Sequence, residues 1–366
     1  MKNKLALLIA SCLMLCTISA FAADNPWQIT SADGDSSIAF GVLAQGQAER
    51  IRATTGALDS QDLFLRRFRL IAGGKITNKL SFFFDTDSPN LGKGTAAGPK
   101  VDTSMYLQDA IFTYTFRPEF QIDAGMLLIA QSHNSVQSAA TLLPIDYGPY
   151  TFITSDSTNS RVGRDYGIQA RGYLLKNHFE YRAGIFQGSR ATITTTHPGT
   201  ENDFRYTGRV AWYPFEAETG FFYTGTTLGT KKILSIGAGF DHQTKYNERS
   251  VDIFYDQPVH DGDGITLQGV YSYLDGGTTF PLLQRQKVWL AEAGYYNKQT
   301  KMGPFVQLSN RLFDDPKISD TEKYLAGIAY WPSGHRFNIK AGVGRTLGST
   351  STESWQAVLQ GQAFVY

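Results

Sequence analysis

The chain has 366 residues, with 34 Lys and Arg against 33 Asp and Glu, and its mean hydropathy is −0.24. This balance offers no basic surface for nucleic acid, and no stretch beyond the N-terminal segment approaches the 18 apolar residues of a transmembrane helix. Aromatic residues make up 13% of the chain and glycines number 36, without helical periodicity. The composition therefore predicts a large all-β protein.

Residues 1–22 have the features of a signal peptide: lysines near the start, a long apolar run, and the small-x-small pattern Ala-Phe-Ala at 20–22. A loose lipoprotein signal ending at Cys12 is the alternative. Both cysteines, Cys12 and Cys16, lie inside this segment, so the mature chain should have no disulfide framework and no cysteine metal site. We expect 23–36 to be a polar periplasmic lead-in.

From residue 37 to 366, apolar and polar residues alternate in segments separated by turns, the pattern of half-exposed strands. The predicted strands are 37–52, 61–74, 80–87, 103–117, 119–130, 165–176, 178–189, 203–213, 231–243, 247–257, 264–275, 286–298, 302–313, 321–332, 335–347 and 353–366.

Long amphipathic strands in an exported chain predict a transmembrane antiparallel β-barrel of the Gram-negative outer membrane, in contact with its lipid, because unpaired backbone amides are not tolerated in hydrocarbon. Long loops should lie outside and short turns in the periplasm. The counts from the two ends agree on sixteen strands if 214–230 is a periplasmic connection. Fourteen or eighteen strands, and a soluble β-sandwich, are the alternatives.

The alternation also predicts which side chains face the lumen. In 61–74, Phe64 and Phe68 should face outward, whereas Arg67 and Arg69 should face the lumen. In the last strand, a row of glutamines should face the lumen, with Tyr366 at the rim. The register there is open, because a slip of one residue reverses every side chain.

The segment 131–164 is too long for an ordinary loop, and its middle is apolar and aromatic. We expect it to fold into the barrel as the third external loop and to set the size and charge of the pore. The candidate constriction residues are His133, Asp146, Tyr147, Tyr150 and Asp156.

A sixteen-stranded barrel encloses an aqueous channel, so inward charges select ions. The candidate anion-guiding residues are Arg67, Arg69, Arg161, Arg164, Arg171, Arg182, Arg205 and Arg209. We expect an anion-attracting spot near the return point of this segment, where Arg161, Arg164 and the inward-facing Arg171 lie close in sequence, with His133 joining it. The alternative for each residue is a wall position paired across strands.

No G-x-S-x-G, H-E-x-x-H or P-loop sequence occurs, and the Asp-rich stretch 256–263 lacks the spacing of an EF-hand. We therefore expect no enzymatic activity, no metal and no cofactor.

Several stretches resemble the phosphate-selective porin O/P family. They are Leu65-Arg66-Arg67-Phe68-Arg69-Leu70 with Gly74-Lys75, Gln108-Asp109-Ala110, Arg164-Asp165-Tyr166-Gly167-Ile168-Gln169, Tyr181-Arg182-Ala183-Gly184-Ile185-Phe186-Gln187-Gly188 and Leu290-Ala291-Glu292-Ala293-Gly294-Tyr295.

The resemblance implies a sixteen-stranded homotrimeric barrel with an inward third loop and arginines and lysines that guide anions. Here 131–164 contains arginines but no lysine, and a coiled coil found in some relatives is absent. We therefore expect a passive channel for small hydrophilic solutes with a mild preference for anions such as phosphate or other oxyanions. The alternatives are a non-selective pore, a plugged structural or adhesive barrel, and a barrel enzyme.

Overall fold

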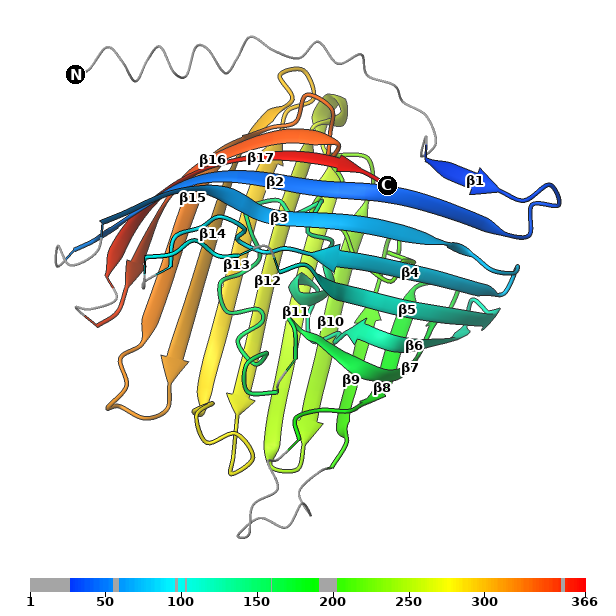
Figure 1. Cartoon of the computed structure of the whole chain (residues 1–366), viewed down its shortest axis with the longest axis horizontal. Helices are drawn as coiled ribbons and strands as arrows, with labels where there is room; N and C mark the ends of the chain where they lie inside the picture. Colours follow the sequence, from blue (N-terminus) through cyan, green and yellow to red (C-terminus); the bar gives the residue numbers. More distant parts are fainter. Residues whose placement is uncertain are drawn as a thin grey trace.

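The computed structural model describes residues 27–54, 59–95, 98–102, 104–158, 160–190, 203–349 and 353–366. The predicted signal peptide, 1–22, lies outside the described residues. Within the described part, sixteen strands, β2 to β17, each pair antiparallel with the next along the chain, and β17 pairs with β2. The sheet is therefore a closed barrel, as Figure 1 shows where the first strands in blue lie beside the last in red. The prediction of sixteen strands is confirmed.

The strands fall close to their predicted positions. Their bounds are β2 Ser37–Ala53, β3 Asp59–Lys75, β4 Leu80–Asp87, β5 Tyr106–Arg117, β6 Phe120–Leu128, β7 Arg164–Leu174, β8 Phe179–Phe186, β9 Arg205–Trp212, β10 Ile233–Gln243, β11 Tyr246–Pro258, β12 Gly264–Asp275, β13 Gln286–Tyr296, β14 Met302–Phe313, β15 Thr321–Tyr330, β16 Phe337–Leu347 and β17 Ser354–Val365. Two short 3₁₀ helices in the described part of the chain, η1 Asn134–Val136 and η2 His260–Gly262, lie in connections. No helix among the described residues is long and apolar enough to cross a membrane.

The part of the predicted lead-in that the structure describes, from residue 27, contains one strand. Residues β1 Gln28–Thr30 pair antiparallel with the start of β2, where Gln28 lies opposite Ala39. The polar composition of 23–36 therefore gave no indication of this short strand, which extends the sheet beside β2.

The alternation along each strand separates an exposed apolar face from a buried polar face. Trp289 and Ile253 are about half exposed on the outside, whereas Gln360 and Gln362 are almost fully buried on the inside. In β17 the glutamine row thus faces inward, as predicted, and Leu359 faces outward. Within the described residues, each of β2 to β17 has a neighbouring strand on both sides, so backbone amides of the barrel wall pair with one another.

A β-bulge in β3 changes the predicted facing of Phe64. Gln45 of β2 lies opposite Arg67, but the next residue, Gly46, lies opposite Leu65, so Arg66 is the extra residue. The bulge places Phe64 on the same buried inner face as Arg67, and Phe64 is only 5% exposed. The outward assignment of Phe64 is therefore wrong, because strict alternation ends at a bulge.

Both ends of the barrel sheet lie at one rim, since Val365 pairs with Val42 near the start of β2. We call this the terminal rim and the opposite one the far rim. The connections at the terminal rim are short, with one exception, 213–232 between β9 and β10. The segment 131–164 connects at the far rim, between β6 and β7.

Candidate channel and its charged lining

The segment 131–164 is held by hydrogen bonds from inner-face side chains of several strands. Lys340 of β16 donates to the carbonyl oxygens of Leu142 and Pro144 at 2.5 and 2.8 Å. Gln362 of β17 donates to the carbonyl oxygen of Ala140 at 2.8 Å. Other inner-face residues that donate to its carbonyls are Gln45, Ser250 and Gln307. The segment therefore contacts strands on widely separated parts of the wall.

The apolar middle of this segment is buried against apolar side chains of the wall. Leu142 and Tyr147 pack in one cluster with Leu43 of β2. Leu143 and Ile145 pack in another with residues of β14, β15 and β17, namely Phe305, Ala329 and Val358. These contacts supply the cover that the apolar stretch needs.

The connection 213–232 pairs with the same segment. The Tyr223 amide donates to the Val136 carbonyl at 2.9 Å, and the Ser138 amide donates to the Tyr223 carbonyl at 2.9 Å. His133 is fully buried between the rings of Phe254 and Tyr223, with centroid distances of 3.9 and 4.9 Å. His133 Nε2 lies 2.6 Å from a carboxylate oxygen of Glu218.

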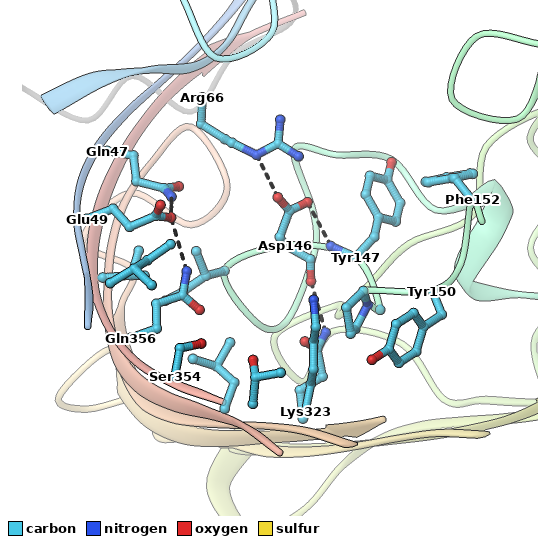
Figure 2. Close-up of a pocket in the computed structure, with 18 of the residues that line it drawn as sticks. Gln47, Glu49, Arg66, Asp146, Tyr147, Tyr150, Phe152, Lys323, Ser354 and Gln356 are labelled. Carbon is cyan, nitrogen blue, oxygen red and sulfur yellow. Dashed lines mark hydrogen bonds and ion pairs between the residues drawn. The ribbon is translucent and has the colours of Figure 1, made fainter. Parts of the chain in front are cut away.

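A cavity of about 790 Å³ lies between residues 145–153 and the inner faces of β2, β3 and β14 to β17 near the far rim (Figure 2). We call it the far-rim cavity. Its lining includes six basic and two acidic residues, of which Arg345 has its side chain on the outer face, over the ring of Trp355. The basic residues are Arg66, Arg67, Lys93, Arg311, Lys323 and Arg345, and the acidic residues are Glu49 and Asp146.

Asp146 binds two of these cations. Its carboxylate lies 2.7 Å from Arg66 and 2.5 Å from Arg67, as the bulge brings two consecutive arginines to one acid. Burial raises the pKa of Asp146, but the two arginines outweigh it and hold the pKa below its ordinary value. Tyr147, another candidate constriction residue, donates a hydrogen bond from its hydroxyl to the Gln137 carbonyl at 2.7 Å. Its ring lies beneath the Arg67 guanidinium.

The sequence of residues 41–234, more than half of the chain, matches the family described as phosphate-selective porin O and P. The chain belongs to this family. It is an outer-membrane porin, a channel protein and not an enzyme. Its terminal rim is thus the periplasmic one, because short turns face the periplasm and longer loops the exterior.

Solved porins share this fold at low sequence identity. OmpF of Salmonella typhi is 13% identical with a TM-score of 0.60, and the match covers 92% of this chain and 99% of that one. The outer membrane channel DcaP of Acinetobacter baumannii is 12% identical, with a TM-score of 0.59 and coverage of 92% and 99%. An anion-selective porin from Comamonas acidovorans is 12% identical, with a TM-score of 0.59 and coverage of 90% and 100%. No curated protein matches the sequence of this porin.

Seven of the eight predicted anion-guiding arginines of this porin are buried on the inner face, each at most 7% exposed. All seven form ion pairs. The pairs are Arg67–Asp146, Arg69 with Asp85 and Asp87, Arg164–Asp109, Arg171–Asp123, Arg182–Glu180, Arg205 with Asp241 and Asp165, and Arg209–Asp252. Their positive charge is therefore largely neutralised within the wall.

The spot predicted around Arg161 and Arg164 holds little free charge. The two residues are joined by backbone hydrogen bonds, but Arg164 is paired with Asp109 and His133 with Glu218. Arg161 itself is exposed and lies over the ring of Tyr106 at 4.5 Å. The predicted loop residue Asp156 is exposed and does not line the far-rim cavity, whereas Tyr150 does.

Two inward cations that line the far-rim cavity have no carboxylate partner among the described residues. Arg311 of β14 hydrogen-bonds to the side-chain oxygen of Gln286 and lies over the ring of Phe313 at 4.4 Å. Lys323 of β15 lies over the ring of Tyr150 at 5.4 Å. Both line the far-rim cavity. Alternation places both on the inner face, but the sequence does not reveal that they lack a partner.

No group of histidine, cysteine or acidic side chains suited to a metal ion occurs within the residues described.

Proposed function

We propose that this porin is a passive diffusion channel for small hydrophilic solutes with a mild preference for anions, and that solutes enter through the far-rim cavity. The observation that carries the proposal is the surplus of positive charge there, above all Arg311 and Lys323. Phosphate and other oxyanions are among the solutes that this charge would attract.

The size of the preference follows from the electrostatics of a wet cavity. An anion about 6 Å from one cation gains roughly 0.7 kcal/mol in water and about four times as much in a partly buried site. Two such cations, screened by salt, give a preference of several-fold rather than complete exclusion of cations. The paired arginines add little because a carboxylate lies beside each guanidinium.

We further propose that 131–164 lies inside the barrel and narrows the channel at Tyr147. Its hydrogen bonds to inner-face residues of β2, β11, β14, β16 and β17 support this position. Tyr147 lines both the far-rim cavity and a second cavity of about 100 Å³ that also includes Tyr366 at the periplasmic rim. The narrowest point would then lie between these cavities, beside the Arg67–Asp146 pair.

The decisive measurement is the reversal potential of the purified protein in a planar bilayer under a KCl gradient. We expect chloride selectivity, and a clear loss of it in the double variant Arg311→Gln with Lys323→Gln. The variant Lys317→Gln is the matched control, because it removes an exposed cation outside the cavity. Cation selectivity of the wild type, or an unchanged potential in the double variant, would overturn the anion preference.

The second candidate is a channel that is closed by the contact between 131–164 and 213–232. Ohmic single-channel steps support an open channel, whereas an electrically silent bilayer supports a closed one.

We also propose that the porin is a homotrimer. An outer membrane protein of Vibrio cholerae, OmpT, is described in a trimer form, and this chain shares its fold with a TM-score of 0.54, 8% identity and coverage of 90% and 99%. Sedimentation of the unheated, detergent-purified protein should give three times the chain mass. A monomer at concentrations at which channels form would contradict the trimer.

A further inference from the structure

The far-rim cavity is lined by aromatic side chains as well as by cations. Tyr147, Tyr150 and Phe152 come from the segment 131–164, and Phe64 comes from β3. Figure 2 shows the first three along one side of the cavity, with Lys323 next to Tyr150. Tyr150 is 9% exposed, so the lining offers a small apolar surface beside positive charge.

Tyr150 is the aromatic residue of the lining that lies beside the positive charge. The Lys323 ammonium lies 5.4 Å from the centre of its ring. Burial raises the pKa of Tyr150 to about 12, and the positive charge of nearby Arg311 opposes the rise. The Tyr150 hydroxyl consequently stays protonated at neutral pH and can donate a hydrogen bond.

The charge of these cations attracts inorganic phosphate, but phosphate gains nothing from the aromatic rings. A small multivalent oxyanion must exchange a strong hydration shell for many fixed donors. Arg311 and Lys323 are two long side chains that each lie over an aromatic ring. They can hold one carboxylate while an aromatic body of the solute packs against the ring of Tyr150, and that packing requires no replacement of hydration.

We propose that the far-rim cavity binds aromatic monocarboxylates, with the carboxylate between Arg311 and Lys323 and the ring of the solute against Tyr150. The cavity volume of about 790 Å³ is within the usual range of small-molecule sites. This inference rests on the proposed function, since it concerns the same entrance.

The test is block of the single-channel KCl current of the full-length porin by benzoate, acetate or inorganic phosphate added at the outer side. We expect the half-blocking concentration of benzoate to be about tenfold below that of acetate, the size of one aromatic packing contact. It should also be below that of phosphate.

The variants separate the ring from the charge. In Tyr150→Leu, the half-blocking concentration of benzoate should rise to that of acetate. In Arg311→Gln, block by benzoate and by acetate should weaken together. The control Phe120→Leu removes an outward ring at the periplasmic rim. It should change neither the block by benzoate nor the block by acetate.

Each outcome decides between the two proposals. Equal block by benzoate and acetate, or stronger block by phosphate, with chloride selectivity retained, overturns this inference and leaves the anion channel standing. An unchanged benzoate preference in Tyr150→Leu also overturns it. Cation selectivity of the wild type overturns the proposed function instead.

Discussion

Replacement of the single aspartate that holds two arginines at the far-rim cavity should make the channel more anion-selective. In Asp146→Asn the side chain keeps its size but loses the charge that pairs with Arg66 and Arg67. The barrel should still assemble, because the Arg67 guanidinium also donates to Gln45 at 2.9 Å. The Asp146 side chain is 31% exposed, so an ion in the cavity would sense its removal.

The magnitude follows from Coulomb's law. An ion that passes about 8 Å from a carboxylate interacts with it by roughly 0.5 kcal/mol in water. Loss of the carboxylate stabilises chloride by this amount and destabilises potassium equally. The chloride-to-potassium permeability ratio should therefore rise roughly fivefold.

The assay is the reversal potential of purified wild type and Asp146→Asn in the same KCl gradient, with Asp156→Asn as the matched control. Asp156 lies in the same segment but is exposed and outside the cavity lining, so its replacement should leave the potential unchanged. An Asp146→Asn channel with wild-type or lower anion selectivity would refute the reasoning.

The pH dependence provides a second check. Because the folded pKa of Asp146 is below its ordinary value, its carboxylate stays charged until the pH falls through that lowered pKa. The difference in potential between wild type and Asp146→Asn should therefore be constant from pH 7 down to about pH 4. A difference that disappears at pH 5 would show that the arginines do not stabilise the charged form.

Three further variants test the packing of the connecting segments. Lys340→Met removes two charge-assisted hydrogen bonds to 131–164, worth about 1.5–3 kcal/mol each, and should give larger, noisier single-channel currents. Gly225→Ala places a methyl group 2.5 Å from the Thr141 carbonyl oxygen and should lower the unfolding free energy by about 1–3 kcal/mol, whereas Gly46→Ala has open space and serves as its control. His335 has its pKa lowered to about 4 by burial, so stability should fall between about pH 6.5 and 4, and His335→Gln should remove that dependence in urea unfolding.

The wall could be predicted from the sequence because its pattern is local. Each strand shows the alternation of its two faces within about ten residues. Alternation alone correctly predicts that Gln360 and Gln362 face the inside of the barrel. The bulge at Arg66 is different, since it depends on how β2 and β3 align. The bulge turns Phe64 to the inner face and brings two arginines to Asp146. No local sequence pattern indicates this bulge.

The connection 213–232 shows a second limit. The strand count predicts that this connection lies at the periplasmic rim. It does not predict that the connection contacts 131–164. The available signal was the run Phe221-Phe222-Tyr223, three aromatic residues in a connection that would otherwise be open to water. In the structure Tyr223 is buried, and Phe221 and Phe222 pack against buried wall residues.

The distribution of free charge follows from desolvation. A guanidinium removed from water requires a partner, whereas one that remains wet does not. The buried arginines, such as Arg182 and Arg209, lie where the wall packs against 213–232, and each has a carboxylate and a nearby Tyr223 ring. Arg311 and Lys323 line an open cavity and are only half-buried, so solvent stabilises their charge without an acid. Alternation along the strands marks all these cations as inward residues without distinguishing them, and only the packing of the connections decides which of them can act on a solute.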